Sequence, residues 1–93
     1  MLNATIKVTL KSGNAYKIKY VARYRAILIS QLDDTRKRPT AAASAEMETM
    51  QKLFNAIYDL GTPETEILQS YLVALSVAYA DVEIMELEHC KSN

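Results

Sequence analysis

The first third of the chain alternates apolar and polar residues with a period of two. One alternating run covers residues 4–10 and a second covers residues 16–21, with the turn-forming sequence Lys-Ser-Gly-Asn between them. Alternation of this kind is typical of half-buried β-strands, and the intervening residues favour a tight turn. We therefore predict a β-hairpin over residues 3–21. Its buried face would consist of Ile6, Val8, Leu10, Tyr16, Ile18 and Tyr20.

The register of this hairpin follows from the same pattern, because directly opposed residues share a face and a one-residue slip would set apolar against polar side chains. A loop of two or four residues places Leu10 opposite a lysine or an alanine, whereas a three-residue loop over residues 12–14 places it opposite Tyr16. We therefore predict the odd-length loop, with Gly13 or Asn14 free to adopt positive φ. The further pairs in this register are Val8 with Ile18, Ile6 with Tyr20 and Lys7 with Lys19.

Beyond Val21 the apolar residues recur at spacings of three and four, which is typical of one face of a helix. This spacing predicts helices at about residues 22–33, 44–60 and 63–88. Strict alternation also continues as far as Arg25, so an extension of the second strand is the alternative for the first of these segments. We prefer the helix, because the first strand is too short to pair with so long a partner.

The boundary between the second and third predicted helices is sharp. Gly61 suits the left-handed end of one helix, while Thr62 and Pro63 suit the start of the next. The last helix would be about 40 Å long and would overhang a domain of this size. The sequence thus predicts an α+β fold in a single domain over residues 1–93, with an N-terminal β-hairpin packed on a bundle of about three helices, the last one long.

The composition narrows the class of protein. The chain has 93 residues, of which 49% are hydrophobic and 24% are charged, as in an ordinary globular domain. Its single cysteine, Cys90, cannot form an internal disulfide, and no leader-like apolar segment opens the sequence. The most apolar stretch, residues 67–80, is too short to span a bilayer. We therefore expect a cytoplasmic protein without a membrane association.

The charged residues sum to a net charge of zero, but the basic and acidic ones are unevenly divided along the chain. Residues 1–40 hold nine Lys and Arg against two Asp, and residues 41–93 hold two Lys against nine acidic residues. Such asymmetry indicates an anionic partner for the basic part, or an attraction between the two halves themselves. The predicted interaction residues form a basic patch of Lys7, Lys17, Lys19, Arg23, Arg25, Arg36, Lys37 and Arg38.

Candidate chemistry is sparse. His89 and Cys90 are adjacent and would point about 100° apart on a helix, so they do not form a nucleophile and base pair. Glu83, Glu86 and His89 could line one helical face in the manner of a di-iron ligand set, but such a set needs two copies of this motif, and we prefer the interpretation as a solvated acidic helix end. No catalytic or phosphate-binding motif is present in the sequence. We therefore predict no catalytic residue, no metal and no cofactor.

Together these features predict a small non-enzymatic protein-interaction module. One use for such a module is that of a phage-type or mobile-element-type inhibitor, which docks on a host protein complex and occludes it. The alternative is a small nucleic-acid-binding protein that uses the basic hairpin and the Arg36-Lys37-Arg38 cluster. We also expect a homodimer formed through the long last helix, whose overhanging apolar stripe would need a partner.

Overall fold

Four strands and two α-helices make up the part of the chain that the computed structural model describes, which is residues 2–32, 40–79 and 81–89. The strands are β1 (Leu2–Thr9), β2 (Ala15–Val21), β3 (Ala26–Gln31) and β4 (Asp81–His89). The helices are α1 (Ala41–Asp59) and α2 (Ile67–Ala78). Short 3-10 turns, η1 (Ala22–Tyr24) and η2 (Glu64–Glu66), precede β3 and α2.

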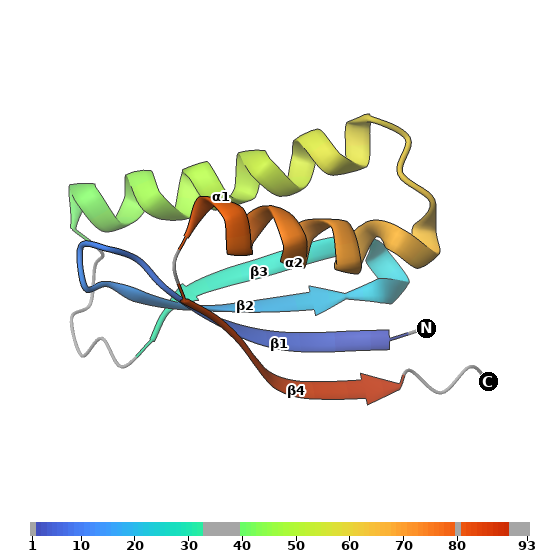
Figure 1. Cartoon of the computed structure of the whole chain (residues 1–93), viewed down its shortest axis with the longest axis horizontal. Helices are drawn as coiled ribbons and strands as arrows, with labels where there is room; N and C mark the ends of the chain where they lie inside the picture. Colours follow the sequence, from blue (N-terminus) through green and yellow to red (C-terminus); the bar gives the residue numbers. More distant parts are fainter. Residues whose placement is uncertain (1, 33–39, 80, 90–93) are drawn as a thin grey trace.

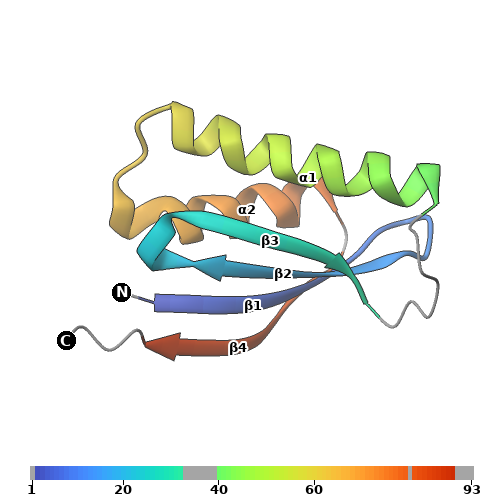
Figure 2. The same cartoon turned by 180° about the vertical axis from the view of Figure 1, so that it is seen from behind.

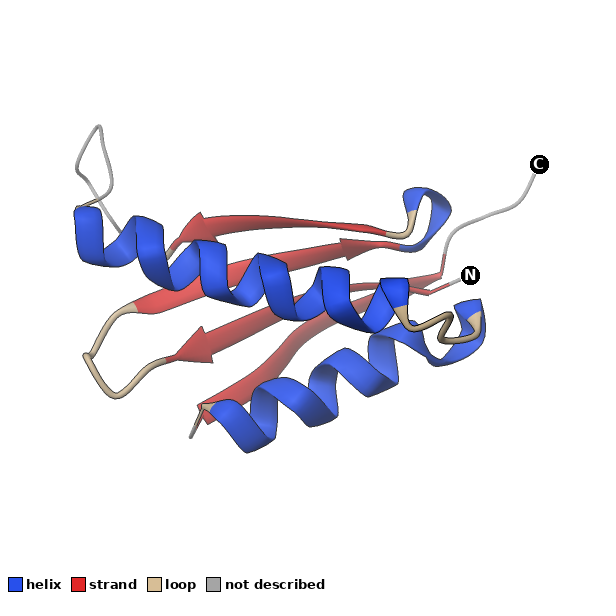
Figure 3. Ribbon diagram, turned by 90° about the horizontal axis from the view of Figure 1, so that it is seen from above, coloured by secondary structure: helices blue, strands red, loops and turns tan. Residues whose placement is uncertain are grey.

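The strands form one antiparallel sheet, and both helices lie on the same face of it (Figures 1 and 2). The strand order is β3-β2-β1-β4, so the first three strands are a meander and the last strand returns to pair with the first. Seen from above, α1 and α2 lie next to each other over the sheet, while β3 follows one margin (Figure 3). The fold therefore has two layers, and the sheet keeps one face free of the described helices.

The α+β class is confirmed, but the predicted hairpin on a bundle of about three helices is wrong. Residues 22–33 contain the turn η1 and the strand β3 instead of a helix. The helical spacing was misleading because Tyr24 and Leu28 are 72% and 65% exposed, whereas Ile27 and Ile29 alternate with polar or exposed neighbours and face the helices. The chain reverses at Arg25, which has a left-handed φ of 48°, so β3 is a new strand and not an extension of β2.

The predicted last helix over residues 63–88 is also wrong, because helix α2 ends at Ala78 and the strand β4 follows. A strand forms here since β1 has a second edge that needs a hydrogen-bonding partner, and β4 fills it along its whole length. The apolar residues of this segment fit a helical spacing only because a bulge interrupts their alternation. Ile6 lies opposite Ile84 whereas Thr5 lies opposite Glu86, so Met85 is an extra residue.

The N-terminal hairpin is confirmed, with a register two residues away from the predicted one. Val8 lies opposite Tyr16, and Lys7 lies opposite Lys17 and not Lys19. The loop still has an odd length, but it begins one residue earlier, because the Leu10 N–H donates to the Asn14 carbonyl at 2.9 Å. Gly13 closes this loop with a φ of 92°, as three-residue hairpin loops require. A shift of two preserves the faces, so the predicted buried side chains remain buried.

Helix α1 matches the predicted helix at residues 44–60 and starts three residues earlier, at Ala41. It starts there because the Thr40 hydroxyl accepts a hydrogen bond from the Ala43 N–H at 3.1 Å, which caps the first turn. At the other end Gly61 adopts a φ of 77° and its N–H donates to the Tyr58 carbonyl, as expected of a helix terminator. No helix in the described segments is both long and apolar enough to cross a membrane.

The core lies between the sheet and the two helices. The Phe54 ring is central: its centroid is 5.2 Å from that of Tyr71 in an edge-to-face contact and 6.1 Å from that of Tyr20. The Tyr71 hydroxyl donates to the Met50 carbonyl at 3.0 Å and so joins α2 to α1. Each fully buried large side chain contributes about 1.5 to 3 kcal/mol. The largest fully buried side chains are Tyr16, Tyr71, Ile6, Ile18, Met50, Leu75 and Val8.

Candidate interaction surface

The face of the sheet that points away from α1 and α2 is covered by neither of the two described helices (Figure 1). Because side chains alternate along strands and opposed residues share a face, its members follow from the register. We call this surface the open face. It consists of Asn3, Thr5, Lys7, Thr9, Ala15, Lys17, Lys19, Val21, Ala26, Leu28, Ser30, Asp81, Glu83, Glu86 and Glu88.

The charges on the open face are separated into two stripes. All four acidic residues lie on the edge strand β4, whereas the three lysines lie on β1 and β2. The acidic stripe is Asp81, Glu83, Glu86 and Glu88, and the basic stripe is Lys7, Lys17 and Lys19. Every one of these side chains is exposed except that of Lys7, which is half-buried. The open face is therefore acidic along β4 and basic along β1 and β2.

The two stripes meet at one rung of the sheet. Lys7 lies opposite Glu83 on one side and opposite Lys17 on the other. Opposite charges across a strand pair are stabilising by about 0.2 to 1 kcal/mol, and like charges are destabilising by a similar amount. The next rung sets Glu86 against Thr5, which in turn lies opposite Lys19. Glu83 therefore compensates part of the repulsion between Lys7 and Lys17.

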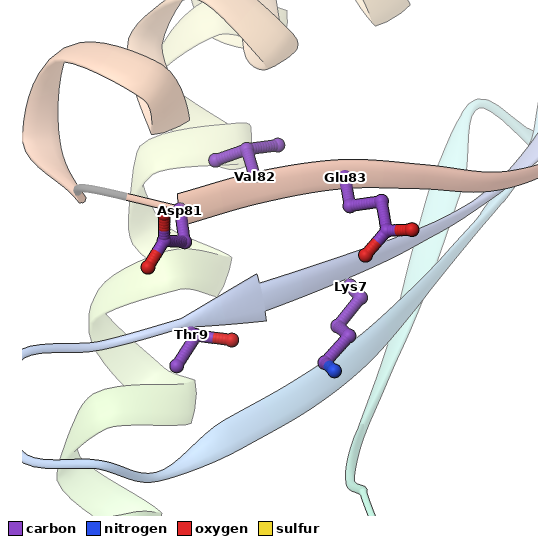
Figure 4. Close-up of a pocket in the computed structure, with 5 residues that line it drawn as sticks. All are labelled: Lys7, Thr9, Asp81, Val82 and Glu83. Carbon is purple, nitrogen blue, oxygen red and sulfur yellow. The ribbon is translucent and has the colours of Figure 1, made fainter.

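A shallow pocket of about 280 Å³ lies at the junction of the stripes, between β1 and β4. Its lining residues are Lys7, Thr9, Asp81, Val82 and Glu83. In Figure 4 the Lys7, Thr9, Asp81 and Glu83 side chains lie on one side of the two strands, and Val82 points to the other. With two carboxylates and one ammonium group on its rim, the pocket is suited to a polar or cationic side chain.

The structure brings together only part of the predicted basic patch. Lys7, Lys17 and Lys19 share the open face. Arg25 is engaged elsewhere, because its guanidinium forms a 3.1 Å ion pair with Glu64 in the turn before α2. The Arg23 guanidinium lies 5.7 Å from the centroid of the Tyr24 ring, in the turn between β2 and β3. The predicted residues Arg36, Lys37 and Arg38 lie outside the described residues.

The ligand-like spacing of Glu83, Glu86 and His89 does not have the helical geometry that the sequence suggested. All three belong to the strand β4, where the backbone of His89 lies opposite Leu2. Glu83 and Glu86 point to the open face on either side of the bulge at Met85. Among the described residues no group of three His, Cys, Asp or Glu side chains is placed to hold a metal ion.

A polar cluster around Glu46 was not predicted from the sequence. One carboxylate oxygen of Glu46, Oε1, accepts hydrogen bonds from the Tyr16 hydroxyl at 2.6 Å and from the Asn14 side-chain amide at 2.7 Å. The other oxygen accepts from the Ser12 hydroxyl at 2.9 Å. The cluster joins α1 to the β1–β2 loop across more than 30 residues of sequence, so local patterns carry no signal of it.

The protonation states in this cluster favour a structural role. Burial raises the pKa of the Tyr16 phenol, and the hydrogen bond to Glu46 raises it further. Burial alone would raise the pKa of Glu46, but the hydrogen bonds from Asn14, Tyr16 and Ser12 outweigh it and lower that pKa. Near neutral pH the phenol is thus a fixed donor and the carboxylate a fixed acceptor. This arrangement fastens the hairpin loop to the helix.

Comparisons of the chain with known protein families, with curated proteins and with solved structures found no match.

Proposed function

We propose that this chain is a non-enzymatic interaction module that binds a partner protein through the open face of its sheet. One observation carries the proposal: both helices lie on the same side of the sheet, and the other side carries its charges in two ordered stripes. Exposure alone is ordinary, because antiparallel sheets commonly have one solvated face. Separated stripes of opposite sign are a recognition feature, since complementary charge sets the orientation and the rate of docking.

The stripes define the chemistry of the partner. Neighbouring strands are about 4.8 Å apart, so the β4 carboxylates lie roughly 10 Å from the β2 lysines. A partner must therefore place acidic groups over Lys17 and Lys19 and basic groups over Glu83 and Glu86 at the same time. A folded protein surface can carry both signs at that spacing. We infer a protein partner with paired acidic and basic patches.

A nucleic acid is the second candidate, and the convergence of Lys7, Lys17 and Lys19 on one face favours it. The acidic stripe acts against it. The distance from the β4 carboxylates to the lysines is comparable with the Debye length of about 8 Å at physiological salt, so the carboxylates would repel phosphates at the same face. Arg25 is in addition held by Glu64 and contributes little to the patch. We therefore place nucleic-acid binding second.

Binding of this kind would cover a partner's surface without transforming it. Occlusion of a host complex, as phage-type inhibitors achieve it, is accordingly the use that we propose for the module. We also propose the cytoplasm as its compartment, because the sequence contains a single cysteine and no cysteine pair that an oxidising compartment would favour.

Site-specific photo-crosslinking tests the proposal, because it captures a partner whose identity is unknown. A photoreactive residue at Thr5, in the middle of the open face, is compared with one at Ser76, which is exposed on α2. In extracts of the native host we expect a discrete protein adduct from position 5 and none from position 76. An adduct that nuclease removes would favour the nucleic-acid alternative. Equal adducts from both positions, or none from position 5, would contradict docking at the open face.

A further inference from the structure

The two edges of the sheet differ in how they are protected against pairing with another strand. The β4 edge carries four acidic residues and a bulge at Met85, which are devices that discourage edge-to-edge pairing. The β3 edge, Ala26–Gln31, carries no charged residue and exposes 65% of Leu28. In Figure 3 β3 follows the outer margin of the described part of the fold. Among the described residues, β4 is therefore an edge protected against further strands, and nothing protects β3 in this way.

The hydrogen-bond pattern identifies which groups of β3 lack a partner in the sheet. The Leu32 N–H donates to the Ala15 carbonyl at 2.9 Å, so this residue pair is a hydrogen-bonded one. Hydrogen-bonded pairs alternate along an antiparallel ladder, and the peptide groups of residues 26, 28 and 30 therefore face β2. Those of Ile27 and Ile29 point to the outer edge, while the side chains of both residues pack towards the core. Their N–H and C=O groups can accept a strand without any loss of core packing.

We propose that β3 pairs with β3 of a second copy of this chain, about a two-fold axis that passes beside Leu28. In this register Ile27 forms a hydrogen-bonded pair with Ile29 of the other copy, and Leu28 lies directly opposite its own counterpart. Apolar side chains meet on both faces. The alternative self-pairing, through β4, would set acidic side chains against acidic side chains. Of the two edges, β3 is therefore the one that can pair with its own copy without opposing like charges.

The distance between the Lys19 side chains and the two-fold symmetry of the dimer both favour this arrangement. Lys19 lies opposite Leu28 on β2, so the two Lys19 side chains would be separated by three strand spacings, about 14 Å, which is beyond the Debye length of about 8 Å. The dimer joins two four-stranded sheets into one continuous sheet with β4 at both ends. Because β4 is protected, assembly stops at two copies. The contact lies at β3 and not at the last helix, and it does not depend on the function of the open face.

Sedimentation equilibrium over a hundredfold concentration range tests the proposal, with Leu28→Lys as the disrupting variant. This substitution sets two ammonium groups opposite each other at the axis. The matched control is Val77→Lys on α2, where the side chain is 84% exposed. We expect wild type and V77K to approach twice the monomer mass, and L28K to stay monomeric. A wild type that is monomeric throughout would overturn the proposal, as would an L28K variant that dimerises like wild type.

If L28K folds poorly, hydrogen exchange on the wild-type protein provides a second test of pairing at β3. The amides of Ile27 and Ile29 should exchange at least tenfold more slowly at the high end of the concentration range than at the low end. The amide of Leu28, which faces β2, should change far less. A dimer in which the Ile27 and Ile29 amides remain fast would assign the contact to another surface and would refute pairing at β3.

Discussion

Tyr16 and Glu46 are joined by a 2.6 Å hydrogen bond that links the start of β2, beside the hairpin loop, to the first helix across 30 residues of sequence. The phenol is the donor and the carboxylate is the acceptor, and the Tyr16 ring is fully buried. Because the bond ends on an ionised group, it is stronger than a hydrogen bond between neutral partners. The hairpin loop and α1 are consequently held together by a contact whose strength depends on pH.

Removal of the Tyr16 hydroxyl should destabilise the fold. Tyr16→Phe is expected to lower the free energy of unfolding by about 1.5 to 3 kcal/mol, since hydrogen bonds to charged groups contribute in that range. Tyr71→Phe is the matched comparison, because its hydroxyl donates to a neutral carbonyl, and about 1 kcal/mol is expected there. Urea denaturation of both variants measures the difference. A Tyr16→Phe variant as stable as wild type would contradict the role given to this bond.

The same cluster makes the stability of the fold depend on acid pH. Hydrogen bonds lower the pKa of Glu46 below its ordinary value of 4.5. A carboxyl group with a lowered pKa in the folded state stabilises the fold above its unfolded pKa and loses that contribution as the pH falls through the folded pKa. Glu46→Gln should therefore be less stable than wild type above about pH 5. The gap should narrow progressively below pH 4.5, and a gap independent of pH would show that Glu46 is not the group responsible.

Phe54, at the aromatic centre of the core, is expected to be essential for the stability of the fold. Phe54→Ala should cost about 3 to 5 kcal/mol, the usual range for removing a buried phenylalanine. A domain of this length has a total stability of about 5 to 14 kcal/mol, so this variant should be marginal at room temperature. Tyr58→Ala on the same helix is the control, because its side chain is 46% exposed, and it should change stability by less than about 1 kcal/mol. Thermal unfolding followed by circular dichroism checks both.

The hairpin loop requires a positive φ at position 13, so Gly13 should be difficult to replace. This residue has a φ of 92° with no atom near the position of an added Cβ, so a substitution there is penalised by backbone strain alone. Gly13→Ala should lower stability by about 1 kcal/mol and Gly13→Asn by less. Lys11→Ala in the same loop should be close to neutral. If Gly13→Ala were also neutral in urea denaturation, the loop would not close at residue 13 as described.

The parts of the fold that the sequence predicted correctly are those with local signals. The hairpin alternates over two neighbouring runs, and α1 has an apolar stripe with Thr40 at one end and Gly61 at the other. The strand β3 was missed because Tyr24, Ile27, Leu28 and Leu32 fit a helical period by coincidence. The side chains of β3 that face the core are Ile27 and Ile29, which alternate as in a strand. The spacing of apolar residues alone does not distinguish a helix from a strand in so short a segment.

The strand β4 was missed for a different reason. Its partner β1 lies at the other end of the chain. No local sequence pattern reveals a pairing between segments so far apart in the sequence. The same error concealed the part of the open face that β4 contributes. Glu83 and Glu86 were expected at the end of a helix, so the acidic stripe beside Lys7 was not foreseen. The basic stripe could be predicted, because it requires only the alternation of Lys17 and Lys19 within β2 and the pairing of β2 with its sequence neighbour β1, which carries Lys7.

The yield of the Thr5 photo-adduct in backgrounds of altered charge tests docking at the open face most directly. Lys17→Glu with Lys19→Glu reverses the exposed part of the basic stripe, while Lys52→Glu makes the same kind of change on the exposed side of α1. Loss of complementary charge slows association and weakens binding. We predict that the double reversal reduces the protein adduct at least tenfold and that K52E leaves it unchanged. Equal yields in the three backgrounds would contradict recognition through the open face.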